Sequence, residues 1–128
     1  MLQFVNVSHA YNQSKVIIDF SLNLIPNKVT ALLGPSGSGK TTILRLASGL
    51  EKIQDGEIIF DNNIISKNSK SLKPEHRKIG YVFQDCALFP HLNIEDNIFY
   101  GLKKENIKLI KKVNLLLEKN KFLKYKSR

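Results

Sequence analysis

One glycine-rich segment of the chain reads Gly34-Pro35-Ser36-Gly37-Ser38-Gly39-Lys40-Thr41. The residues before it, Val29–Leu33, are nearly all apolar, which is typical of a short buried strand. The residues after it, Lys40–Ser48, have apolar side chains at helical spacing, and Gly49 is a typical helix stop. The sequence therefore predicts a strand, a tight glycine-rich loop and a helix in direct succession.

The segment fits the pattern G-x-x-x-x-G-K-[ST] at every position. Its glycines let main-chain N–H groups wrap closely around a polyanion such as a triphosphate, and the helix that follows points its positive end at the same place. Lys40 can reach the β- and γ-phosphates, the Thr41 hydroxyl is suited to bind Mg²⁺, and Thr42 extends the helix start toward the α-phosphate. We therefore predict a site for ATP with Mg²⁺. Its residues are Gly34, Pro35, Ser36, Gly37, Ser38, Gly39, Lys40, Thr41 and Thr42. The alternative is a glycine-rich turn with a chance lysine.

Two residues outside this loop are further candidates. Tyr11 lies in the expected turn between two strands, where an aromatic ring can stack on a purine, although its spacing also fits an ordinary surface tyrosine. Gln84 follows an apolar run, and an amide at the end of a strand beside a phosphate loop can touch Mg²⁺ or an attacking water.

Charge and composition narrow the function classes. The net charge is +9, but residues 103–128 carry ten Lys or Arg against two acidic residues, so the excess lies in the tail. No nucleic-acid motif accompanies this charge, and we interpret it as a lysine-rich solvated helix face rather than a nucleic-acid contact. The single cysteine, Cys86, excludes an intrachain disulfide, and three scattered histidines have no metal-ligand spacing. We read no signal peptide and no membrane-spanning stretch.

The remaining elements follow from apolar patterns and turn residues. Strands are expected over Leu2–Val7, Val16–Ile25, Glu57–Phe60 and Ile79–Phe83, with a polar loop over Ser66–Lys73. Helices are expected over Glu95–Leu102, capped by Asn93, and over Glu105–Leu123.

Three stretches together make a family recognisable: ALLGPSGSGKTTILRLASGLE over residues 31–51, GEIIFDN over 56–62, and RKIGYVFQDCALFPHLNIEDNIFYGL over 77–102. From Leu2 to about Leu117 the chain resembles the ATP-binding subunits of ABC transporters, above all bacterial importers of ferric iron, sulfate and polyamines. The resemblance implies that Tyr11 stacks on adenine, that Gly34–Thr42 is the Walker A loop, and that Gln84 is the Q-loop glutamine, a Mg²⁺ ligand.

The resemblance also implies a fold and a cellular setting. The fold is α/β, a P-loop NTPase-like core with an N-terminal antiparallel β subdomain, incomplete at the C-terminus. Residues 1–102 are the N-terminal part of the ATP-binding domain, and residues 103–128 are a basic helical segment that starts the helical subdomain. The partners are membrane permease subunits at Asp85–Asn97, a second ATP-binding subunit and, indirectly, a solute-binding protein. The location is the cytoplasmic face of the bacterial inner membrane, and ferric iron is the first candidate solute.

Some family features do not occur in this sequence. It has no LSGGQ-like signature, no Walker B strand ending in Asp-Glu and no switch histidine, and Pro26-Asn27-Lys28 stands where a Gly-Glu pair is usual. We therefore expect an N-terminal half that binds nucleotide weakly, does not hydrolyse it alone, and exposes apolar residues of Val29–Leu33 and Ile79–Phe83.

Other functions remain as alternatives. The resemblance implies a transport ATPase subunit that acts as an enzyme only when a complete site is assembled, and a non-catalytic nucleotide-binding remnant is the main alternative. A small kinase needs several substrate-phosphate arginines, and this chain has only Arg45, Arg77 and Arg128. A GTPase needs an N-K-x-D guanine motif, which does not occur.

Overall fold

The computed structural model describes residues 1–85, 88–102 and 107–119. Contacts divide the chain into two compact units, Met1–Tyr81 and Val82–Arg128. This division falls earlier in the chain than the expected domain boundary after residue 102. The residues that follow that expected boundary lie outside the described ranges, so the boundary stays a prediction. Within the described residues, no helix is both long and apolar enough to cross a membrane.

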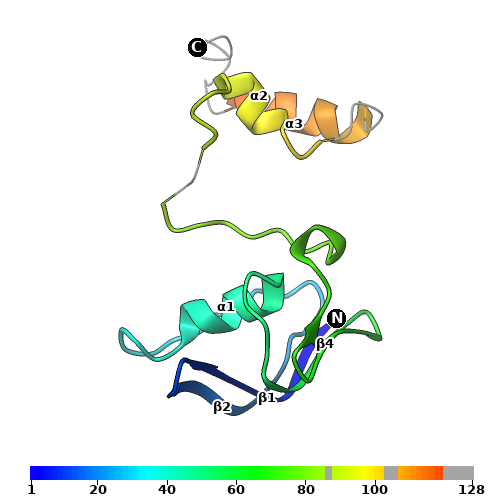
Figure 1. Cartoon of the computed structure of the whole chain (residues 1–128). Coiled ribbons are helices and arrows are strands. Elements are labelled where there is room, and N and C mark those ends of the chain that lie inside the picture. Colours follow the sequence, from blue (N-terminus) through cyan, green and yellow to red (C-terminus); the bar gives the residue numbers. More distant parts are fainter. Residues whose placement is uncertain (86–87, 103–106, 120–128) are drawn as a thin grey trace. The chain divides into compact units, whose positions relative to one another are not determined.

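The first unit is built on a five-stranded antiparallel sheet in the order β2-β1-β3-β4-β5 (Figure 1). This confirms the predicted N-terminal antiparallel subdomain. The strands are β1 (Leu2–Tyr11), β2 (Ser14–Asn23), β3 (Asp55–Phe60), β4 (Asn63–Lys67) and β5 (Lys70–Ser71).

Strand β1 is longer than predicted because its pairing with β2 tolerates irregularities. The register shifts between Phe4 and Val7, where Asn6 takes a left-handed backbone with φ 49°. Asn6 donates its side-chain amide to Asp19 at 2.6 Å, and Asp19 on β2 has the same φ of 49°. These kinks interrupt the strict alternation of apolar and polar residues from which a strand is predicted. The strand predicted from the sequence therefore ends at Val7, whereas β1 continues to Tyr11.

Helix α1 spans Lys40–Ser48, as predicted, and packs against the sheet (Figure 1). Ile43, Leu46 and Ala47 are buried on the face of α1 that meets the sheet. They join one core of buried apolar residues with Phe4, Val7, Ile17, Ile53, Ile58 and Ile65. Burial of this face holds the helix in place and so positions the glycine-rich loop at its start.

Three of the expected elements are wrong. Val29–Leu33 and Ile79–Phe83 form no strand, and the predicted loop Ser66–Lys73 instead contains the end of β4 and all of β5. A strand needs a hydrogen-bonding neighbour, and no described strand pairs with either apolar run. Val29 is 100% exposed and Leu33 92% exposed, so the expected apolar surface of this segment is confirmed.

The described part of the second unit holds two helices, α2 (Ile94–Phe99) and α3 (Ile107–Lys119). Asn93 caps α2, as predicted, because its side-chain oxygen accepts from the Asp96 N–H at 2.8 Å. The expected ends of the second helix, at Glu105 and Leu123, lie outside the described residues. A short 3₁₀ turn in the first unit, η1 (Pro74–His76), was not predicted.

Candidate phosphate-binding site

The loop of residues 34–39 leads directly into the first turn of α1. Ser38 N–H donates to the Pro35 carbonyl at 3.3 Å, which closes a turn, and Ile43 N–H donates to the Gly39 carbonyl at 2.9 Å, which begins the helix. The N–H groups of Lys40, Thr41 and Thr42 come before the first intrahelical donor. Because helix geometry leaves them without an intrahelical acceptor, they are available to a ligand.

The electrostatics of this helix start favour an anion. Gly39 occupies the N-cap and provides no side-chain cap, and no acidic residue stands in the first turn. The partial positive charge of the helix N-terminus is therefore not neutralised by the first turn of α1 itself. Exposed N–H groups on a positive helix end make an established anion-binding arrangement.

Gly39 is the glycine that the geometry of the site requires. Its backbone is left-handed, with φ 87° and ψ 3°, and it lies against β2. A Cβ atom added there would lie 2.6 Å from Ile17 Cδ1 and 3.4 Å from the Val16 carbonyl oxygen. Gly39 is thus needed both for the turn into the helix and for the close approach of the loop to the sheet.

Lys40 folds back over the loop. Its ammonium group donates to the carbonyl oxygens of Gly34 at 2.9 Å and Pro35 at 2.6 Å, and to Ser38 Oγ at 3.2 Å. The loop therefore holds a positive charge within its own curve. A phosphate that binds there must take over the ammonium from these oxygen atoms, and it gains a charge-assisted hydrogen bond by doing so. The residues present thus fit a phosphate group.

The two threonines differ in exposure. Thr41 is exposed, so its hydroxyl is accessible from solvent, whereas Thr42 is buried with α1 against the core. The predicted Mg²⁺ role of Thr41 is compatible with this exposure and stays a prediction, as does the contact of Thr42 with an α-phosphate.

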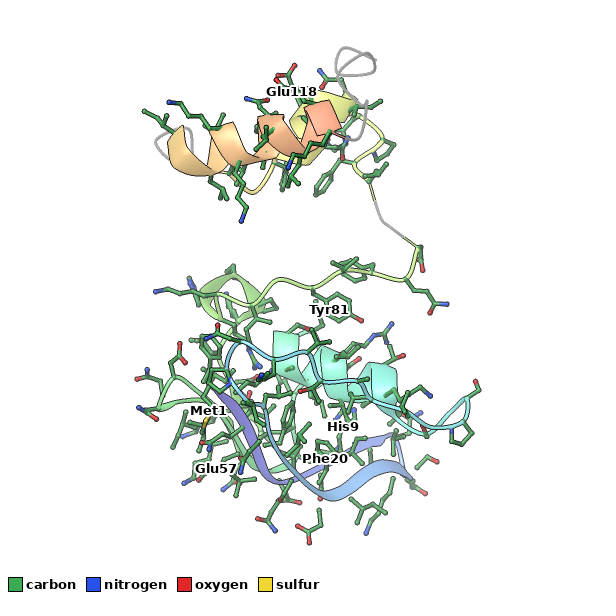
Figure 2. The ribbon with its side chains drawn as sticks, turned by 180° about the vertical axis from the view of Figure 1, so that it is seen from behind. Met1, His9, Phe20, Glu57, Tyr81 and Glu118 are labelled. Atoms are coloured by element: carbon green, nitrogen blue, oxygen red, sulfur yellow. The ribbon has the colours of Figure 1, made fainter. Side chains whose placement is uncertain are left out.

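Tyr11 is the last residue of β1, not part of the turn where the sequence placed it. Its ring meets His9 edge-on, with centroids 4.7 Å apart and planes at 85°. Its hydroxyl also interacts with Arg45, an exposed residue of α1. The Arg45 guanidinium donates to the hydroxyl oxygens of Tyr11 and then Tyr81, and this raises its pKa above the ordinary value. Figure 2 shows Tyr81 beside α1. Tyr11 thus contacts α1 through Arg45, and its stacking on adenine stays a prediction.

Gln84 belongs to the second unit and lies in a turn rather than at the end of a strand. Its roles as a Q-loop residue and as a Mg²⁺ ligand therefore stay predictions. The described residues hold no group of three or more His, Cys, Asp or Glu side chains placed to bind a metal.

The segment expected to meet a permease, Asp85–Asn97, includes residues 86 and 87, which are outside the described ranges. Asn97 organises the described remainder: its amide donates to the carbonyls of Phe89, Leu92 and Asn93 at 3.0–3.1 Å, and its oxygen accepts from the Phe89 N–H at 2.8 Å. A side chain that closes the loop onto its own helix gives no periodic signal, so the sequence pattern missed it.

Next to this loop is a cavity of about 580 Å³. It lies within the second unit and has both acidic and apolar walls. Its lining residues are Leu92, Glu95, Asp96, Phe99, Tyr100, Leu102, Ile110 and Asn114. The Asn114 side-chain oxygen is buried and accepts no hydrogen bond from the described residues.

Comparison with known proteins places these features in a family. The model of the ABC transporter family matches residues 17–128. The Fe(3+) ions import ATP-binding protein FbpC 2 of Pectobacterium atrosepticum is 44% identical over 117 residues, covering 91% of this chain and 34% of that protein. The spermidine/putrescine import ATP-binding protein PotA of Mycoplasmopsis synoviae is 44% identical over 126 residues, covering 94% of this chain and 26% of that protein.

A solved structure agrees with the fold. It is the dimeric structure of a post-hydrolysis state of the ATP-binding cassette MJ0796 bound to ADP and Pi. The match has a TM-score of 0.71 and 27% identity, and it covers 92% of this chain and 56% of that one. The chain spans about a third or less of the length of the two importer proteins it matches. With a glycine-rich loop leading into a helix over an antiparallel sheet, and a family model that matches most of its length, the chain belongs to the ABC transporter family and has the fold of its P-loop ATPases.

Proposed function

We propose that this chain binds the phosphates of ATP, with Mg²⁺, on Gly34–Thr42 and serves as part of the ATP-binding subunit of an ABC importer. The observation that carries the proposal is the Lys40 ammonium, held by three oxygen atoms of the loop at an uncapped helix start. Bound Mg²⁺ would neutralise phosphate charge, and Thr41 and Gln84 are the residues proposed to hold it.

The test measures MgATP affinity by isothermal titration calorimetry on the full chain and on Lys40→Ala. Removing a charge-assisted hydrogen bond to phosphate costs about 1.5–3 kcal/mol, so affinity should fall by about 10- to 150-fold. Lys70→Ala is the matched control, because it removes an exposed lysine from β5. Equal affinity of Lys40→Ala and Lys70→Ala would contradict the proposal.

Transport itself requires partners. Glu95 and Asp96 stand beside the apolar side chain of Phe99 in the cavity of the second unit, which suits a partner segment with basic and apolar residues. We assign this region, with Asp85–Asn97, to contact with permease subunits at the cytoplasmic face of the membrane. Charge reversal by Glu95→Lys should reduce co-purification with permease subunits, while Glu57→Lys, on β3 of the other unit, should not.

A second ATP-binding subunit is the other proposed partner, and the dimeric state of the matched ATP-binding cassette supports it. The solute is iron in one matched relative and spermidine or putrescine in the other, at equal identity. Ferric iron remains our first candidate. A non-catalytic remnant would bind MgATP equally well but would not stimulate uptake when supplied to permease-containing vesicles.

A further inference from the structure

Arg77 is the most deeply buried charged side chain among the described residues, with 1% of its surface exposed. The described residues offer it no carboxylate partner. Burial lowers the pKa of its guanidinium below the ordinary value. A buried cation without an ion pair is costly unless its donors are all used, so the surroundings of Arg77 must compensate for the lost hydration.

The compensation comes from neutral oxygen atoms on three sides. Nη1 donates to the carbonyls of Leu46 and Ala47 at 2.8 and 2.9 Å. Nε donates to the Leu72 carbonyl at 2.8 Å, and Nη2 donates to Ser66 Oγ at 2.6 Å. Nη2 also donates to Ser71 Oγ. The planar fork of an arginine can serve several acceptors at fixed angles, which an ammonium group cannot do.

The two acceptors on α1 have a special position. Leu46 and Ala47 belong to the last turn of α1, whose carbonyls lack intrahelical partners and carry the negative end of the helix dipole. The guanidinium therefore caps the C-terminus of the helix whose N-terminus faces the proposed phosphate site. Ser66 on β4 and Ser71 on β5 complete the link, so one side chain joins the end of the helix to the edge of the sheet.

Gly49 leaves the space that this arrangement needs. It follows α1 with φ 82°, as a helix stop does, and this much the sequence predicted. A Cβ atom there would lie 2.4 Å from Arg77 Nε and 2.8 Å from Cζ. The close approach of backbone to guanidinium is a second reason for a glycine at this position.

We propose that Arg77 is a positioning residue for nucleotide binding: by clamping the C-terminus of α1 to β4 and β5, it sets where the N–H groups at the other end of the helix meet the phosphates. A site built from main-chain donors depends on the placement of the whole helix, because the donors cannot adjust individually. This inference rests on the proposed function of the loop and adds the residue that orients it.

The experiment compares Arg77→Lys with the full wild-type chain. Lysine keeps the charge but lacks the fork, so it cannot hold α1, β4 and β5 together. MgATP affinity is measured by calorimetry at a temperature where circular dichroism shows each variant folded. We expect Arg77→Lys to bind MgATP about fivefold more weakly, roughly the effect of one lost hydrogen bond.

A core variant separates positioning from stability. Ile58→Val or Ile58→Ala is chosen to match the melting temperature of Arg77→Lys, since Ile58 is buried on β3 and contributes only packing. Amide NMR shifts of Gly37 and Lys40 give a second readout, because neither residue hydrogen-bonds to Arg77. They should move in Arg77→Lys and not in the Ile58 variant.

The outcomes are distinct. Wild-type affinity in Arg77→Lys, or an equal loss in the matched Ile58 variant, would overturn the inference. If Arg77→Lys does not fold, Gly49→Ala displaces the same guanidinium and should also weaken MgATP binding relative to a stability-matched Ile58 variant. Lys40→Ala in the same assay keeps the two proposals apart: unchanged affinity there refutes the phosphate site itself, whereas loss there without loss in Arg77→Lys refutes only the positioning role.

Discussion

Replacing Gly39 by alanine tests how the loop is held against the sheet. Gly39 has φ 87°, and a left-handed backbone costs a residue with a Cβ atom about 1–2 kcal/mol. The new Cβ would lie 2.6 Å from Ile17 Cδ1, well inside the ordinary carbon–carbon contact of about 3.5–4.0 Å. Ile17 is 5% exposed and must therefore move within a packed core, which costs about 1–2 kcal/mol more. The expected loss of unfolding free energy is about 2–4 kcal/mol.

Gly37→Ala provides the matched control. Gly37 has φ 81°, nearly that of Gly39, but a Cβ atom there meets nothing within 4 Å. This variant should lose only the backbone contribution, about 1–2 kcal/mol. Urea unfolding followed by circular dichroism measures all the variants, with a common slope as the check that the transition stays two-state.

A double variant tests whether Ile17 Cδ1 is the atom that clashes with a Cβ at position 39. Ile17→Val removes Cδ1, the atom in conflict, so Gly39→Ala combined with Ile17→Val should be less destabilised than the sum of the two single changes. The expected coupling is about 1 kcal/mol. Equal unfolding free energies for Gly39→Ala and Gly37→Ala, together with strict additivity in the double variant, would refute this reasoning.

Four further variants, with Ser69→Ala as a control, probe other contacts. Leu46→Ala removes a fully buried side chain of α1 and should cost about 2–5 kcal/mol in unfolding free energy, measured by urea titration. Ser66→Ala leaves one Arg77 N–H without its acceptor and should cost about 1–3 kcal/mol, seen as a lower melting temperature, whereas Ser69→Ala, at an exposed turn, should change little. Asn97→Ala removes the side chain that closes the loop before α2, so hydrogen exchange at the Phe89 amide should become faster. Asn93→Ala removes the N-terminal cap of α2, worth about 1 kcal/mol, and should reduce helicity measured by circular dichroism.

Local signals predicted α1 and its two ends well. Both ends of the helix were correct because a glycine-rich loop, a helical apolar spacing and Gly49 coincide within a short stretch. The cap of α2 by Asn93 was correct for the same reason, since a cap depends on residues three apart. The residues of the motif, Gly34–Thr42, lie together because they all belong to one loop and one helix turn.

Apolar runs were a weaker guide. Val29–Leu33 has the composition of a buried strand, but composition does not supply a neighbouring strand. Val29 and Leu33 are exposed instead, and only Leu32 packs against the core. The polar residues of Ser66–Lys73 looked like a loop, yet two of them, Ser66 and Ser71, pair across β4 and β5 and accept from Arg77.

The amino-acid order alone was enough for the phosphate motif, the helix behind it and the family, because these depend on residues close together in the chain. The role of Arg77 could not be predicted from the amino-acid order. In the sequence, Arg77 is one of three arginines and has no pattern of its own. Its role becomes visible only in the fold, where residues up to 31 positions away meet around its guanidinium. Contacts between distant segments arise from burial and hydrogen bonding of the folded chain, so only the folded structure identifies the residue that clamps α1 in place.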